Sequence, residues 1–112
     1  MNIEELRTFC LGLPGVTEDI KWGNNLVFSV AGKMFCLADL DPPLHVVFKV
    51  PEDQFAELTN TINITQASYF ARMKWVNVSD ESRFSRKEWE YYLQQSYDLV
   101  KAKLPKKIRD SI

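Results

Sequence analysis

The stretch from Leu26 to Val50 constrains the fold of this chain more than any other segment. It contains three short apolar runs, which are separated by the tight-turn signal Ala31-Gly32 and by the longer connection Asp39–Pro43. Within the first and third runs, apolar residues alternate along the chain, a pattern that is typical of strands, and short connections favour antiparallel neighbours. We therefore predict a three-stranded antiparallel meander, apolar on one face, that needs a layer of helices over that face.

A helix is predicted at each end of the chain. Asn2 is a good N-cap for a first helix that runs to about Leu11, and Glu5 completes a capping box. The C-terminal helix has its own capping box, formed by Ser85 and Glu88. Its apolar positions and flanking tyrosines keep helical spacing until the sequence Leu104-Pro105 ends it: Trp89, Tyr92, Leu93, Tyr97, Val100 and Leu104.

The remaining segments give weaker patterns. Val16–Asn25 is interpreted as a polar lead into the meander, and Asn60–Gln66 as a polar break. Between the third strand and that break, a short helix with Pro51 at its first position is predicted. Residues 67–72 could form one helical turn, and Met73–Val78 is predicted as a fourth strand. Either Lys74, Val76 and Val78 or Met73, Trp75 and Asn77 could form the inward face of that strand.

The 112 residues suffice for a single domain, residues 1–112, of the α+β class. Its net charge of −1 gives no overall attraction to nucleic acid or to an anionic membrane. The charge is nevertheless uneven. Residues 1–65 carry four Lys or Arg against nine Asp or Glu, a balance of −5, whereas residues 66–112 carry ten against six, a balance of +4. Such asymmetry can mark a binding face, although a basic cluster near a helix C-terminus explains part of it equally well.

The sequence offers little for catalysis or metal binding. His45, the one histidine, lies in a predicted strand, and neither Cys10 nor Cys36 has a histidine nearby in the sequence. We expect both cysteines to be buried free thiols. No zinc-ligand spacing and no phosphate-binding glycine motif is present, so neither a metal nor a cofactor is predicted. No apolar run approaches membrane-spanning length and no signal peptide is evident, which predicts a cytoplasmic protein without a membrane partner.

Three places combine cations with aromatic rings: Lys21-Trp22, the sequence RMKW at residues 72–75, and the C-terminal basic segment. Cations suit phosphates and flat rings suit exposed bases, so this pattern is typical of nucleic-acid contact. The alternative is that Trp22 and Trp75 are packing residues whose neighbouring cations extend along apolar surface. The residues alone leave both interpretations open.

Four segments of the chain resemble the MmcQ/YjbR family in order and spacing. They are LPGVTEDIKWGNNLVFSVAGKMFCL, FKVPEDQFAEL, ASYFARMKWVNV and QSYDLVKAKLPKKIR. The resemblance implies an antiparallel sheet packed by N- and C-terminal helices, a two-layer fold similar to that of type III secretion chaperones. It also implies DNA binding through a pair of loop wings. By position, the wings correspond to the turn at 31–33 and to the loops that flank residues 73–78.

Together these observations predict a non-enzymatic YjbR-like domain that contacts double-stranded DNA weakly and in a salt-dependent way. The predicted contact residues are Lys21, Trp22, Lys33, Arg72 and Lys74. A second hypothesis is a protein-interaction or homodimerising module that uses exposed aromatics such as Trp22. An enzyme or small-ligand binder has the least support, because no catalytic motif is present.

Overall fold

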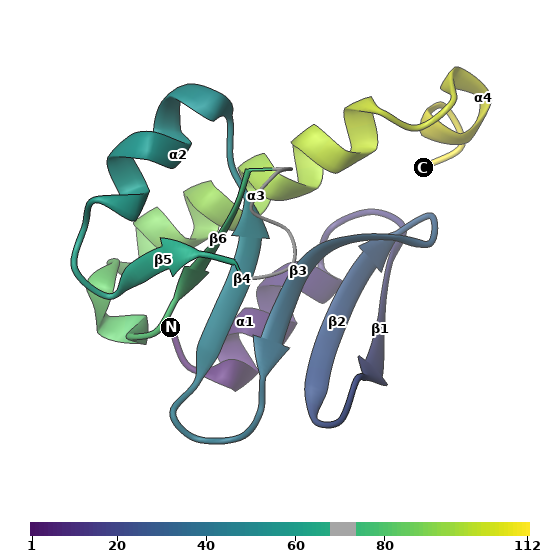
Figure 1. The fold of residues 1–112 in the computed structure, drawn as a ribbon. Helices are drawn as coiled ribbons and strands as arrows, with labels where there is room; N and C mark the ends of the chain where they lie inside the picture. The colour runs from purple at the N-terminus through teal and green to yellow at the C-terminus, as the bar shows by residue number, and fades with distance from the viewer. Residues whose placement is uncertain (68–73) are drawn as a thin grey trace.

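The computed structural model describes residues 1–67 and 74–112. Their strands form one antiparallel sheet of six strands in the order β1-β2-β3-β4-β6-β5 (Figure 1). The strands are β1 Val16–Lys21, β2 Asn25–Val30, β3 Lys33–Asp39, β4 His45–Lys49, β5 Ile64–Gln66 and β6 Trp75–Val78. The helices are α1 Ile3–Leu11, α2 Glu52–Thr59, α3 Arg86–Ala102 and α4 Lys106–Arg109, with a 3-10 helix η2 at Glu81–Arg83.

The predicted meander is confirmed as β2, β3 and β4. The first turn is tight because Val30 pairs directly with Lys33 and only two residues connect them. Both connecting residues have positive φ, 49° at Ala31 and 78° at Gly32, which is the conformation of the hairpin turn whose twist matches that of the flanking strands. Glycine adopts such a conformation without strain, whereas alanine does so at some cost.

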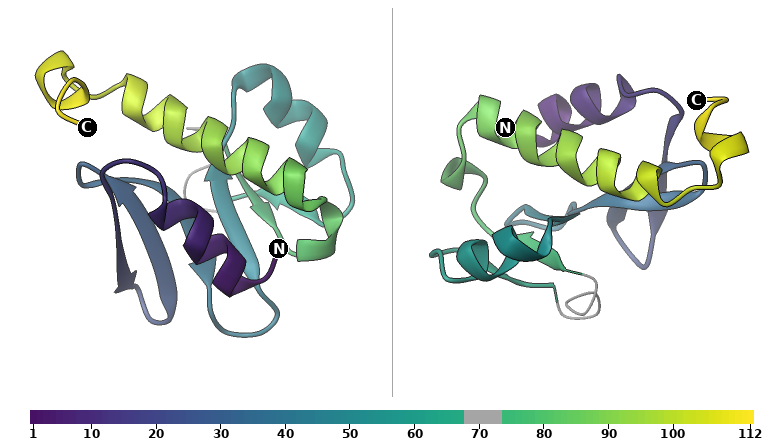
Figure 2. Two further views of the ribbon diagram at one scale, coloured as in Figure 1. Left: turned by 180° about the vertical axis from the view of Figure 1, so that it is seen from behind. Right: turned by 90° about the horizontal axis from the view of Figure 1, so that it is seen from above.

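Helices α1 and α3 cover one face of this sheet, as the two views in Figure 2 show. Helix α3 contacts β2, β3 and β4, while α1 contacts β1. Helix α2 lies beside β5 and β6, at the opposite side of the sheet from β1 (Figure 1). The α+β class and the two-layer architecture predicted from the sequence are therefore confirmed.

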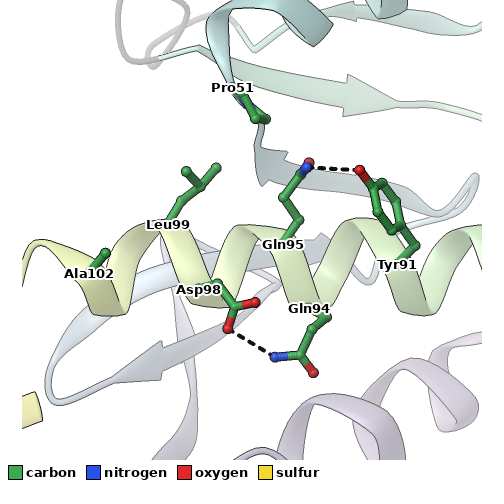
Figure 3. Close-up of a pocket in the computed structure, with 7 residues that line it drawn as sticks. All are labelled: Pro51, Tyr91, Gln94, Gln95, Asp98, Leu99 and Ala102. Atoms are coloured by element: carbon green, nitrogen blue, oxygen red, sulfur yellow. Dashed lines mark hydrogen bonds between the residues drawn. The ribbon is translucent and has the colours of Figure 1, made fainter.

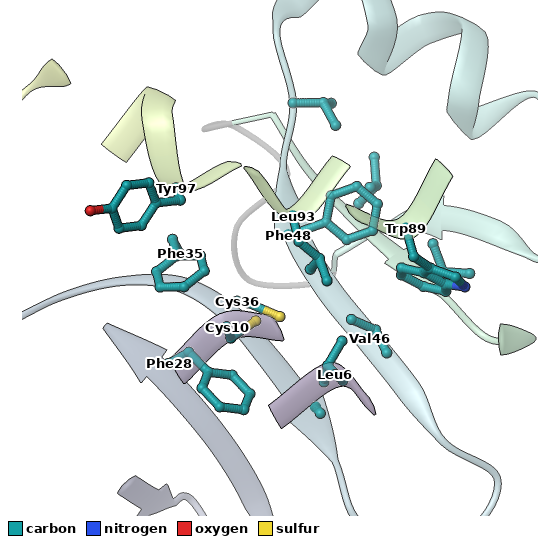
Figure 4. Packing of buried hydrophobic residues seen from close by; sticks show 14 of the residues in the cluster. Leu6, Cys10, Phe28, Phe35, Cys36, Val46, Phe48, Trp89, Leu93 and Tyr97 are labelled. Atoms are coloured by element: carbon teal, nitrogen blue, oxygen red, sulfur yellow. The ribbon is translucent and has the colours of Figure 1, made fainter. Parts of the chain in front are cut away.

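The core lies between the sheet and these two helices (Figure 4). Trp89 of α3 is 1% exposed and packs edge-on against Phe48 of β4 and against Phe84. Its indole Nε1 donates a 2.7 Å hydrogen bond to the carbonyl of Glu81, so the buried polar atom of the ring is satisfied. The predicted capping boxes of α1 and α3 are both present. Helix α3 is thus held at its start by a cap and along its length by aromatic packing.

A hydroxyl group joins α3 to the two central strands. Strand β3 contains a bulge at Phe35, since Phe28 pairs with Cys36 and Ser29 already pairs with Met34. Ser96, which is fully buried on α3, donates a 2.6 Å hydrogen bond to the Phe35 carbonyl and accepts a 2.9 Å bond from the backbone N–H of Lys49. The hydroxyl therefore bridges two backbone groups, one on β3 and one on β4, just beyond the last paired residues Cys36 and Phe48.

Two strands were not predicted. Val16–Asn25, interpreted as a polar lead, instead contains β1, which pairs with β2 over six residues. Asn60–Gln66, interpreted as a polar break, contains the short strand β5. Both strands lie at edges of the sheet, where exposed polar side chains are common and make a strand resemble a loop in sequence.

Other boundaries differ from the predictions by a few residues. Pro51 is the N-cap of α2 rather than its first helical residue. Strand β6 begins at Trp75, and Val76 and Val78 belong to the core, which settles the choice of its inward face. Trp75 is buried as well, so the packing interpretation holds for this residue. The helical turn suggested for residues 67–72 lies almost wholly outside the described residues.

Replacing Trp89 by alanine should lower the free energy of unfolding by about 3–5 kcal/mol, because the substitution removes a buried ring together with its hydrogen bond. Urea unfolding measures the change. Trp22→Ala is the matched control: Trp22 is 64% exposed, so its loss should cost less than about 1 kcal/mol. Equal effects of the two substitutions would contradict the packing described here.

Ser96→Ala should cost about 2–4 kcal/mol, because it leaves the Phe35 carbonyl and the Lys49 N–H buried without a partner. Ser111→Ala, at an exposed serine, removes the same atom and should change stability by less than about 0.5 kcal/mol. Urea midpoints for the two variants test the bridge. A Ser96→Ala midpoint close to that of the wild-type chain would show that the two backbone groups find other partners.

Candidate nucleic-acid interface

The structure places the predicted contact residues at two opposite ends of the sheet. Lys21 and Trp22 lie at the turn between β1 and β2, and Lys33 lies at the turn between β2 and β3. Strand β2 runs the whole way between these turns, which at about 3.3 Å per residue puts them roughly 20 Å apart. Lys74 precedes β6 and lies at the Lys33 end, because its carbonyl accepts a 3.0 Å bond from Val50, just after β4. Arg72 is outside the described residues.

The end that carries Lys21 and Trp22 also carries acidic residues. The connection between β3 and β4 meets the β1–β2 turn there, where Asn24 donates a 3.0 Å hydrogen bond to Asp41. Asp39 lies beside this contact, at the end of β3. The Lys21 ammonium lies 5.9 Å from the centre of the exposed Trp22 ring, so the two form one cation–aromatic pair. Trp22 is therefore exposed rather than a packing residue, but its surroundings do not favour a polyanion.

The opposite end of the molecule gathers most of the remaining cations. In Figure 1 the β2–β3 turn lies below α4 and the C-terminal end of α3, while the end of β4 lies under the middle of α3. The chain terminus packs onto the same region, with a side-chain carbon of Ile112 about 3.1 Å from where a Cβ on Gly15 would lie. We call this region the basic end. Its cations are Lys33, Lys49, Lys74, Lys101, Lys103, Lys106, Lys107 and Arg109.

Six of these eight cations were not among the predicted contact residues, and two of the six, Lys49 and Lys103, come together in the fold. Lys49 ends β4 and Lys103 caps α3, yet the two ammonium groups lie close together. Burial lowers the pKa of Lys49 below its ordinary value, and the neighbouring Lys103 lowers it further. Together with Lys74 they line a pocket of about 280 Å³. No sequence signal could have found the cluster, because its members are far apart in the chain and only the fold brings them together.

A shallow groove of about 420 Å³ adjoins this pocket along α3 (Figure 3). It shares Pro51 and Leu99 with the pocket and continues past Gln95 to Tyr91. The Tyr91 hydroxyl accepts a 3.1 Å bond from Gln95 and a 3.2 Å bond from Gln54, which ties α3 to α2. A further hollow of about 450 Å³ lies between α1 and β1, at the other side of the sheet, and its lining includes the ion pair of Arg7 with Glu18.

Cys10, Cys36 and His45, the residues considered for catalysis, have surroundings typical of structural residues. Cys10 and Cys36 are fully buried free thiols, as predicted. A hydrogen bond with Cys10, together with burial, raises the pKa of Cys36 well above that of a free thiol, which disfavours the reactive thiolate. His45 Nδ1 lies 3.3 Å from the side-chain amide of Asn77.

No three His, Cys, Asp or Glu side chains in residues 1–67 and 74–112 gather closely enough to hold a metal ion. None of the helices that the structure describes is both long and apolar enough to cross a membrane.

Comparisons with known proteins agree with this architecture. The fold is similar to that of a Deinococcus radiodurans protein described by the family-model domain DUF419, at 26% identity and a TM-score of 0.89, over 98% of this chain and 86% of that one. A Pseudomonas syringae protein shares the fold at 16% identity and a TM-score of 0.73, over 89% of this chain and 99% of that one. No curated protein matches the sequence.

The fold thus defines a small α+β domain with one antiparallel sheet covered by helices. The family model YjbR matches residues 11–99, and the chain belongs to the YjbR family. The resemblance identified from the four sequence segments is therefore confirmed. The family assignment carries no activity with it, and the role of the basic end has to be argued from its own geometry.

Proposed function

We propose that this domain is a cytoplasmic, non-enzymatic module that binds double-stranded DNA weakly, through the phosphate backbone, at its basic end. The observation that supports this most is the gathering of eight cations from four separate parts of the chain. Within residues 1–67 and 74–112, none of these eight forms an ion pair with a carboxylate. Cations without internal partners remain available to neutralise phosphates.

Part of the acidic surface lies far from the basic end, although Glu52 lines its pocket and Asp110 is the C-cap of α4. The N-terminal half, with its balance of −5, places Asp19, Asp39 and Asp41 at the far end of the sheet, about 20 Å away. That distance exceeds the range over which charges act at physiological ionic strength, roughly 8 Å. A duplex approaching the basic end would therefore experience a local positive field, although the whole protein is slightly negative.

Binding of this kind should be weak and insensitive to sequence. The cations are flexible lysines and one arginine, at the ends of strands and helices, and no helix or hairpin among the described residues projects as a reader of base edges. Phosphate contacts alone give affinities near 10⁻⁴–10⁻⁶ M at physiological salt. Lys33, on the tight turn that corresponds to one wing of the family, is exposed and available for such a contact.

A specific observation also favours the second hypothesis, homodimerisation at the opposite end. Strand β1 is a free edge of the sheet, and it exposes Ile20 by 50% and Trp22 by 64%. If two copies paired their β1 strands antiparallel about Ile20, Asp19 of one copy would face Lys21 of the other. That arrangement would satisfy the open edge, cover apolar surface and pair opposite charges.

The DNA proposal predicts a salt-dependent affinity. With about three or four phosphate contacts, log affinity against log salt should have a slope near −3 to −4, since each contact contributes about −0.9. Lys33→Glu and Lys74→Glu should each weaken binding by about tenfold at low salt and make the slope less steep by about one. Fluorescence anisotropy with a labelled duplex, measured across a salt series, gives both quantities.

Lys21→Glu is the matched control, because it makes the same charge change at the other end of the sheet. It should leave the affinity within about twofold of wild type, since Lys21 lies beyond the screening distance. A loss as large as that of Lys33→Glu would relocate the contact to the β1–β2 turn. Absence of binding at low salt would overturn the proposal.

The dimer hypothesis is tested by sedimentation velocity. A dimer should appear at micromolar concentrations in the wild-type chain, and Trp22→Ser with Ile20→Thr should return it to a monomer. Dimerisation through apolar surface should persist at high salt, in contrast to DNA binding. A wild-type chain that remains monomeric at high concentration would exclude this function for β1.

A further inference from the structure

The pocket at the junction of β4, α2 and α3 has an unusual charge composition. Its lining consists of Lys49, Val50, Pro51, Glu52, Lys74, Leu99 and Lys103, and we call it the lysine pocket. Three of these residues are lysines and one is a glutamate, Glu52. Because like charges repel, an anion that enters such a cluster lowers its electrostatic energy.

Lys49 differs from an ordinary surface lysine in its burial. Its residue surface is only 9% exposed, and buried lysines ordinarily have a carboxylate partner. No carboxylate among residues 1–67 and 74–112 lies within ion-pair distance of Lys49, Lys74 or Lys103. Burial lowers the pKa of Lys49, and the neighbouring cation Lys103 lowers it further. A largely buried lysine side chain that lines a pocket without a carboxylate partner favours an anion as its counter-charge.

The start of α2 supplies further donors to the same pocket. Pro51 is the N-cap of this eight-residue helix and makes no side-chain capping bond, so no capping side chain accepts from the first N–H groups. The Pro51 carbonyl accepts from Gln54 and Phe55, while the N–H groups of Glu52 and Asp53 have no acceptor among the described residues. Free N–H groups and the positive end of the helix dipole favour an anion at this position.

Lys74 is held in place by strain and by two contacts. Its φ of 63° lies in the left-handed region, which is unfavourable for a residue other than glycine. The 3.0 Å bond from Val50 to its carbonyl fixes the backbone, and its ammonium lies 5.0 Å from the centre of the Phe55 ring. These contacts keep a third positive charge beside the pocket instead of letting it extend into solvent.

We infer that the lysine pocket binds one phosphate group, which three lysines and the free backbone N–H groups at the start of α2 surround. A phosphate carries up to two negative charges and several acceptor oxygens, and it can satisfy ammonium groups and backbone donors together. The inference does not require the proposed DNA function, because a free phosphate, a phosphorylated small molecule and a backbone phosphate share this chemistry. Glu52 limits the affinity, since its carboxylate competes for the same cations.

Calorimetric titration of the full chain with inorganic phosphate, in a chloride buffer at neutral pH, tests the site. We expect saturable binding of one phosphate per chain. Lys103→Met removes one exposed ammonium and should weaken binding about tenfold, as expected for the loss of one charge-assisted contact. Glu52→Gln removes the competing carboxylate and should tighten binding severalfold. Titration without saturation, or phosphate affinity unaffected by Lys103→Met, would overturn the inference.

Lys107→Met provides the matched control, because it removes an exposed lysine of α4 that does not line the pocket. Its phosphate affinity should equal that of wild type, and an equal loss in both variants would mean general charge attraction rather than a site. Lys49→Met should abolish phosphate binding. Because Lys49 is buried, a urea unfolding curve must first show that the Lys49→Met variant is folded. A folded variant that still binds phosphate would also contradict the inference.

Competition with a labelled duplex separates the sources of the phosphate and the two proposals. If saturating phosphate displaces the duplex at constant ionic strength, and Lys103→Met prevents this, the site takes a backbone phosphate. If phosphate binds without displacing the duplex, or if the protein binds phosphate but no duplex, the site takes a free phosphate or a phosphate ester. The DNA proposal is then decided by the duplex titration alone. DNA binding without saturable phosphate binding would reject the lysine pocket alone.

Discussion

The bridge made by the Ser96 hydroxyl holds the two layers of this domain in register. Strands β3 and β4 pair normally at Cys36 and Phe48, but the bulge at Phe35 disturbs the ladder next to them. A bulge leaves backbone groups unpaired, and in a dry core each such group costs roughly 1–3 kcal/mol. Ser96 supplies a donor and an acceptor from α3 and satisfies one group on each strand. The helix layer is thereby tied to the sheet by a directional contact as well as by apolar packing.

Other contacts extend this attachment along α3. Tyr97, the next residue, donates a 2.5 Å bond to the Pro14 carbonyl and so connects α3 to the segment between α1 and β1. Trp89, two turns earlier, is bonded to η2 and packed on Phe48. Each of these side chains is polar at one atom and apolar over the rest, so one residue can fill the core and also fix an orientation. The order of elements around α3 follows from these three anchors.

The features that sequence could predict are those carried by local chemistry. Alternation in Leu26–Val50, the turn at Ala31-Gly32 and the capping box at Ser85 depend on residues close together in the chain, and all three are present. Strands β1 and β5 were missed because only one of their edges is paired, and the exposed side chains of β1 hide its alternation. The bridge by Ser96 was also beyond prediction, since it joins residues 47 and 61 positions apart.

The same limit explains the outcome for the contact residues. Lys21-Trp22 and Lys33 look equivalent in sequence, because both place a cation at a turn, but antiparallel topology sends successive turns to opposite ends of a sheet. Conversely, Lys49 carried no signal, since a lysine at the end of a strand is usually solvated. Its significance arises only where β4 meets the end of α3 and the start of α2.

The bridge and the lysine pocket meet at a single residue. The backbone N–H of Lys49 donates to the Ser96 hydroxyl, and that of Val50 donates to the Lys74 carbonyl. Pro51, the following residue, is the N-cap of α2. Three consecutive residues thus position two of the cations and the free helix start. A site built on such fixed backbone loses little entropy when a ligand binds, because its donors are already oriented. The nearly neutral net charge of the chain conceals this local concentration of lysines, which come from parts of the sequence that are far apart. An anion bound in the lysine pocket would offset the repulsion between Lys49 and Lys103.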